Sequence, residues 1–101
     1  MSKEAIYVIS TLPDSKINKF KLVKHTGAQK KLLSKYSTYY MDPIIFYYKS
    51  VDNSQKIENI IKRQLKNYGL KHKDGTYTEW VSLDLETIID TINIGFFHYG
   101  N

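Results

Sequence analysis

Two strand-like segments joined by a short connection lie near the start of the chain and most constrain its fold. Residues 5–9 (AIYVI) are β-branched and aromatic, and residues 19–24 (KFKLVK) alternate between apolar and basic side chains. The connection contains a turn-forming Pro-Asp-Ser sequence at 13–15. Consecutive strands with so short a connection favour an antiparallel hairpin. The alternation of its second strand predicts two faces, with Phe20, Leu22 and Lys24 on one and Lys21 and Val23 on the other.

Helical periodicity recurs three times after this hairpin. Apolar residues at helical spacing predict helices over 27–36, 54–68 and 84–94. Thr26 is a suitable N-cap for the first of these helices. Gly69 is expected to end the second helix in a left-handed conformation.

One more strand and one extended piece complete the predicted fold. Residues 43–50 are apolar on both faces, which favours a central strand, and residues 76–83 are a short strand or extended piece. The order β-β-α-β-α-(β)-α predicts an α+β fold with a small, mainly antiparallel three-stranded sheet flanked by helices. We expect a single domain over 1–101, in which residues 93–101 form an aromatic C-terminal extension. That extension packs on the domain or contacts a second copy or a larger host polypeptide.

Composition narrows the class of protein. The net charge is +5, from 15 Lys and Arg against 10 Asp and Glu, so an anionic partner such as nucleic acid is expected, although a lysine-rich surface also serves solubility. The absence of cysteine excludes disulfides, thiol catalysis and thiolate metal sites. The three histidines are scattered without metal-ligand spacing, which predicts no zinc site. The start has too short an apolar run for a signal peptide, and no stretch is long enough for a membrane helix, so we expect a soluble intracellular protein without a membrane partner.

Short motifs along this order of elements resemble the GIY-YIG nuclease superfamily, in the compact form found in phage and large DNA virus proteins. The first strand contains "AIY" at 5–7, and the second reads "FKLVKHT" at 20–26, where the family has Tyr-Ile-Gly or Tyr-Lys-Ile-Gly-Lys-Thr. "KKLLSKYST" at 30–38, "KIENIIKRQL" at 56–65 and "TEWVSLDLE" at 78–86 follow in the family's order. The resemblance covers about residues 4–92.

The resemblance implies a divalent-metal-dependent endonuclease site and, for a viral protein, the host cytoplasm or nucleus. In such a site Tyr7 positions or activates water, Lys31 stands where the family has a phosphate-binding arginine, and Glu58 holds Mg²⁺. Phosphodiester hydrolysis needs an activated water, neutralised phosphate charge and a stabilised leaving oxygen. A single carboxylate with several waters suits Mg²⁺. Mg²⁺ is therefore expected only if the domain is active, and otherwise no cofactor.

Three substitutions within the motifs predict that this site has eroded. Phe20 lacks the tyrosine hydroxyl, Lys31 lacks the two-pronged donor of arginine, and Val23 blocks the backbone approach that a glycine permits. Each lost donor is expected to cost on the order of 10²–10³ in rate. His25 could act as a base in place of the missing hydroxyl.

Basic residues on the second strand and on two helices are candidate phosphate contacts: Lys21, Lys24, Lys30, Lys35, Lys62, Arg63 and Lys66. The alternative is that they form solvated helix faces. Glu58 could equally be a solvated carboxylate paired with Lys62 one turn along. We expect Glu79 and Trp80 to fix the last helix, with Trp80 in the core.

The favoured interpretation is therefore a GIY-YIG-like domain with an eroded active site, which binds nucleic acid with little or no cleavage. Two alternatives stay open at this point. One is an active metal-dependent endonuclease that uses Tyr7, Lys31 and Glu58. The other is a protein-interaction or self-association module in which the positive charge is incidental.

Overall fold

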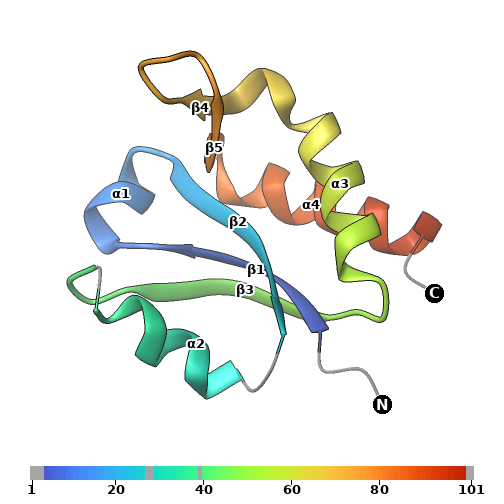
Figure 1. Cartoon of the computed structure of the whole chain (residues 1–101), viewed down its shortest axis with the longest axis horizontal. Coiled ribbons are helices and arrows are strands. Elements are labelled where there is room, and N and C mark those ends of the chain that lie inside the picture. Colours follow the sequence, from blue (N-terminus) through green and yellow to red (C-terminus); the bar gives the residue numbers. More distant parts are fainter. Residues whose placement is uncertain (1–3, 27–28, 39, 100–101) are drawn as a thin grey trace.

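The computed structural model describes residues 4–26, 29–38 and 40–99 and shows an antiparallel sheet between two layers of helices (Figure 1). In chain order the elements are β1 (Glu4–Ser10), α1 (Leu12–Lys16), β2 (Lys19–Thr26), α2 (Gln29–Tyr36), β3 (Ile44–Ser50), α3 (Ser54–Gln64), the 3-10 helix η1 (Lys66–Tyr68), β4 (Gly69–Lys71), β5 (Tyr77–Ser82) and α4 (Leu85–Tyr99). The predicted α+β class with a mainly antiparallel sheet is confirmed.

The sheet has five strands in the order β3-β1-β2-β5-β4, so the prediction of three strands was wrong. The 76–83 segment does form a strand, and a short partner, β4, precedes it in a hairpin with β5. The prediction of a central position for β3 was also wrong, because β3 lies at an edge and is largely half-buried. The central strand on that side is β1, in which every residue from Ala5 to Ser10 is buried.

The predicted hairpin is present and its register is well defined. β1 pairs antiparallel with β2, placing Tyr7 opposite Val23. The connection forms a short helix, α1, instead of the predicted loop. Thr11 caps it by accepting a hydrogen bond from the Asp14 backbone N–H at 3.3 Å, and Pro13 stands in its first turn.

The sheet has a separate apolar core on each face. One face packs against α3 and α4, and its buried residues include Ile6, Val8, Phe20, Leu22, Ile57, Ile61, Ile88 and Ile92. The other face packs against α2, with Tyr7, Ile9, Leu32 and Tyr36 buried. Figure 1 shows α2 on the opposite side of the sheet from α3 and α4. The hairpin therefore presents a different set of β2 side chains to each layer of helices.

The second predicted helix ends earlier than expected, and the predicted start of the first one lies partly outside the described residues. Thr26 is the last residue of β2, and residues 27–28 of the predicted helix start lie outside the described residues. α3 ends at Gln64, and Gly69 is extended (φ −69°) because it begins β4, so the predicted left-handed cap was wrong.

The C-terminal aromatic segment continues α4 as far as Tyr99. Gly95 permits close packing of α4 on α3, because a Cβ there would lie 3.2 Å from the Ile61 side chain. Phe96 packs against the core, whereas Phe97 is 83% exposed. Among the residues that the structure describes, no helix is long and apolar enough to cross a membrane.

Candidate functional site

Tyr7 and Tyr36 form a buried hydroxyl pair beneath α2. Their oxygens are 2.6 Å apart, and Tyr7 is 1% exposed. Burial, then the hydrogen bond to Tyr36 and the nearby carboxylates Glu79 and Glu58, raise the pKa of Tyr7 far above its ordinary value. Tyr7 is therefore a neutral phenol at physiological pH. It can exchange hydrogen bonds but cannot supply a phenolate as a base.

The face of β2 that meets Tyr7 carries Lys21, Val23 and His25. The ring of His25 lies edge-on to the ring of Tyr7, with centroids 6.0 Å apart. Phe20 lies on the opposite face, where it is buried against Phe46 with ring centroids 5.5 Å apart. The expectation that Phe20 lacks a catalytic hydroxyl came from its place in the family motif. Strand alternation instead puts Lys21 on the face that meets Tyr7, and Phe20 is a core residue.

A chain of ion pairs joins the two helical layers around the edge of β2. Lys21 Nζ lies 3.6 Å from Glu79 Oε1, and Lys62 Nζ lies 3.8 Å from Glu79 Oε2. Lys62 Nζ is also 3.7 Å from Glu58 Oε2, which accepts a hydrogen bond from the Lys24 backbone N–H at 2.8 Å. The chain therefore has two ammonium groups and two carboxylates, and its net charge is zero.

Of the two lysines in the ion-pair chain, Lys21 is the less exposed. Its side chain is 16% exposed, and its Nζ lies 5.0 Å from the centre of the Tyr36 ring. Burial lowers the pKa of Lys21, but Tyr36, Tyr40 and Glu79 outweigh this effect and raise the pKa above its ordinary value. Lys21 is therefore a fixed positive charge that Glu79 compensates.

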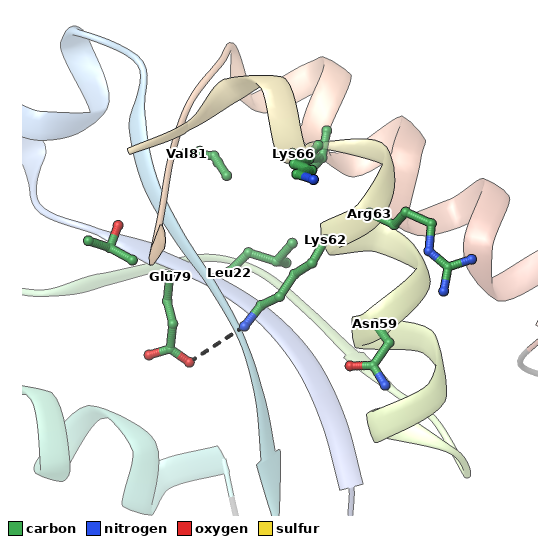
Figure 2. A pocket seen from close by; sticks show the side chains of 10 residues that line it. Leu22, Asn59, Lys62, Arg63, Lys66, Glu79 and Val81 are labelled. Atoms are coloured by element: carbon green, nitrogen blue, oxygen red, sulfur yellow. Dashed lines mark ion pairs between the residues drawn. The ribbon is translucent and has the colours of Figure 1, made fainter. Parts of the chain in front are cut away.

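Two cavities flank the ion-pair chain. The cavity on the α2 side has a volume of about 550 Å³ and is lined by Lys21, Val23, Lys35, Tyr36, Tyr40 and Glu79. The cavity between α3 and the β4–β5 hairpin has a volume of about 260 Å³ and is lined by Leu22, Asn59, Lys62, Arg63, Leu65, Lys66, Gly69, Thr78, Glu79 and Val81. Figure 2 shows Lys62 reaching across the second cavity to Glu79. Glu79 lines both cavities, so the ion-pair chain stands between them.

The cations proposed from the sequence lie on both sides of this edge. Lys24, Lys35, Arg63 and Lys66 are exposed, and Lys35 Nζ lies 5.5 Å from the Tyr36 ring centre. In Figure 2 the Arg63 guanidinium points away from Lys62 and Glu79. These four exposed cations are called the basic rim below.

Two other predicted residues are less closely tied to the site. Lys31 is exposed on α2, one turn before Lys35, and is not among the residues that the contacts above join. The side chain of Lys30 lies outside the described residues. Among the predicted catalytic residues, the rings of His25 and Tyr7 are in contact on the α2 face of the sheet, whereas Glu58 reaches the Lys24 backbone from α3, which packs on the other face.

The donor set does not fit a divalent cation as it is arranged. Glu58 is 6% exposed, and its Oε2 atom already has the Lys24 N–H and the Lys62 ammonium as partners. Among the described residues, no three His, Asp or Glu side chains form a group that could hold a metal. Mg²⁺ needs oxygen ligands at about 2.0–2.1 Å, and an ammonium at the carboxylate repels it.

Sequence reasoning missed two residues of the site. Tyr36 was not among the predicted site residues, and Glu79 was expected to fix the last helix. Glu79 instead joins Lys21 and Lys62, and Trp80 is half-buried beside Tyr40 (ring centroids 6.0 Å apart) rather than in the core. The adjacent residues Glu79 and Trp80 could have indicated this arrangement, because neighbouring residues of a strand point to opposite faces of the sheet.

The chain is a small α+β domain with helices on both faces of its sheet. Its candidate site lies where the pairing of β2 with β5 ends, next to Lys21 and Glu79. Residues 4–95 match the T5orf172 domain, so the chain belongs to the T5orf172 domain family, a family of phage and viral domains that resemble homing endonucleases. The narrower GIY-YIG resemblance stays a prediction.

Two similar proteins come from Acanthamoeba polyphaga mimivirus. The chain is 33% identical over 88 residues to "Uncharacterized protein R10", covering 87% of the chain and 23% of that protein. It is 29% identical over 84 residues to "Uncharacterized protein R9", covering 83% of the chain and 22% of that protein. The chain thus spans less than a quarter of the length of these relatives. No solved structure matches it.

Proposed function

We propose that this domain of a viral protein binds nucleic acid through the phosphate backbone and cleaves it little or not at all. The supporting observation is the distribution of charge at the edge of β2. The ion-pair chain from Lys21 to Glu58 is neutral, whereas the basic rim around it is exposed. Phosphates bind the rim, and the centre lacks uncompensated charge for a transition state.

The state of the tyrosine pair supports the absence of cleavage. The Tyr7 hydroxyl is engaged by Tyr36, and the raised pKa of Tyr7 keeps it protonated. In the described part of the chain, every buried side-chain nitrogen or oxygen has a hydrogen-bond partner. The buried polar groups of the site therefore already satisfy one another, which leaves none of them free to stabilise developing charge.

The basic rim sets the expected strength of the salt dependence. Contact of its four cations with about four phosphates gives a slope near roughly −3.6 in log K against log salt. These contacts carry no sequence information, so affinity is expected to vary little between sequences of equal length. Aromatic stacking on unpaired bases is not needed for this mode of binding.

Fluorescence anisotropy of a labelled duplex, titrated across salt, tests the binding. The variant that combines Arg63→Ala and Lys66→Ala should reduce the slope from about −3.6 to about −1.8, since each phosphate contact contributes about 0.9. Lys16→Ala is the matched control, because Lys16 is an exposed cation on α1 that lines neither cavity. An absence of binding at low salt would refute the proposal.

A plasmid assay with Mg²⁺ or Mn²⁺ tests cleavage. We expect no nicking above background by the wild-type chain. Nicking that both Glu58→Ala and Tyr7→Phe abolish would establish an active endonuclease and overturn the second part of the proposal. Binding and cleavage are thus decided by separate measurements.

A further inference from the structure

Lys62 holds an unusual position for a helix-surface lysine. Its ammonium lies between two carboxylates, 3.7 Å from Glu58 Oε2 and 3.8 Å from Glu79 Oε2. Glu58 and Lys62 are one helical turn apart on α3, so the helix itself sets their proximity. Glu79 comes from β5, on the far side of the cavity shown in Figure 2. The ammonium thus connects two elements as well as two charges.

The surroundings of Glu58 require a cation. The residue is 6% exposed, and a carboxylate removed from water must be compensated by a positive partner and by hydrogen-bond donors. The Lys24 backbone N–H supplies a donor at 2.8 Å. The described structure places one full positive charge within ion-pair distance of Glu58, and it is the Lys62 ammonium.

We infer that Lys62 is a tethered replacement for a divalent cation: its ammonium occupies the place between Glu58 and Glu79 where a hard cation would bind carboxylate oxygens. A site between two carboxylates from different elements is one that Mg²⁺ or Mn²⁺ can occupy when no ammonium competes. Lys62 therefore determines that this edge of the domain excludes metal. The inference goes beyond the proposed function, because it holds whether or not the domain binds nucleic acid.

Paramagnetic broadening by Mn²⁺ tests this inference without nucleic acid. The reporter is the Lys24 backbone amide, which lies next to any metal at Glu58 because the two are hydrogen-bonded. In the ¹⁵N-labelled wild-type chain, MnCl₂ should leave this amide no more broadened than amides of other exposed strand ends. In Lys62→Met the same amide should broaden selectively, at Mn²⁺ concentrations lower by about tenfold or more, since a repelling charge at contact distance is gone.

Three further variants control the measurement. Lys66→Met removes a cation one turn along the same helix region without touching Glu58, and should behave as the wild type. Lys62→Arg keeps the positive charge and should still exclude Mn²⁺. If Lys62→Met fails to give a dispersed amide spectrum, Lys62→Gln, which removes the charge but keeps a polar side chain, takes its place with the same expected broadening. Combining Lys62→Met with Glu58→Gln should abolish the broadening, because the carboxylate ligand is lost.

Two results would overturn the inference. Selective broadening of the Lys24 amide in the wild type or in Lys62→Arg would show that a cation at residue 62 does not exclude metal. Equal spectra for the wild type and a folded Lys62→Met would show that this edge is not a cation site at all. Neither result depends on nucleic-acid binding, so the failure of the proposed function and the failure of this inference are distinguishable.

Discussion

The hydroxyl pair of Tyr7 and Tyr36 gives a prediction that can be worked out from the structure. The oxygens are 2.6 Å apart, and the two residues are 1% and 4% exposed, so phenylalanine at either position takes a hydrogen-bond partner from the other, buried hydroxyl. Losing one member of a buried pair costs about 1–3 kcal/mol, whereas replacing both is close to neutral. We expect Tyr7→Phe and Tyr36→Phe each to lower the free energy of unfolding by about 1.5 kcal/mol, and the double variant to lower it by much less, close to zero.

Urea unfolding at pH 7 measures this double-mutant cycle. The single tryptophan, Trp80, serves as the fluorescence reporter. Its ring centroid lies 6.0 Å from that of Tyr40, which in turn stacks on Tyr36. Tyr68→Phe is the matched control, because Tyr68 is 47% exposed and its hydroxyl loss should cost little. Additive losses in the double variant would refute the reasoning, since they would mean that the two hydroxyls do not satisfy each other.

High pH gives a second reading of the same pair. Burial and the Tyr36 hydrogen bond raise the pKa of Tyr7 above 10.0, so the folded state holds this proton more tightly than the unfolded chain. The contribution of the raised Tyr7 pKa to the free energy of unfolding is complete below about pH 10. It is lost as the pH rises further, at up to about 1.4 kcal/mol per pH unit. Above pH 10, Tyr7→Phe should make the free energy of unfolding fall less steeply with pH. A smaller pH dependence should remain from Tyr47, whose pKa is also raised by burial. An unchanged slope would contradict the burial of Tyr7.

Two packing predictions complete the set. Glu58→Ala should lower the free energy of unfolding by about 2–3 kcal/mol, because the Lys24 N–H and the Lys62 ammonium lose a buried acceptor. Glu58→Gln keeps an acceptor and should cost about 1 kcal/mol. Urea unfolding compares the two variants, and equal costs would contradict the role of the acceptor. Gly95→Leu should cost about 2 kcal/mol by thermal unfolding, since its Cβ would start 3.2 Å from Ile61, and a neutral result would mean that α4 is loosely packed.

Local patterns in the sequence predicted most of the fold. Alternation along β2, with Phe20 and Leu22 on one face, correctly separated the two faces, and the apolar stripe of α3 correctly predicted its buried side. What failed depended on strand neighbours, which local patterns do not encode. The apolar run of β3 suggested a central strand, yet β3 is an edge strand whose residues are largely half-buried.

The candidate site was only partly predictable for a related reason. Tyr7 and Glu58 were proposed from short motifs, and the structure places them in the layers on opposite faces of the sheet. The role of Glu79 depends on where β5 pairs with β2, and that pairing joins residues far apart in the sequence. Phe20, which stands where the family motif has a tyrosine, packs in the core against Phe46, and this packing could not be read from the motif.

The hydrogen bond from the Lys24 N–H to Glu58 has a consequence for aggregation. β5 pairs with β2 only along Lys19–Lys21, and the described structure adds no other strand to the rest of that edge. An open stretch of strand backbone is a template on which a strand of another chain can add. By taking up the Lys24 donor with a carboxylate, Glu58 removes one of the hydrogen bonds that such an intruding strand would need. The acid that the family motif suggests for chemistry thus also protects this domain against edge-to-edge association.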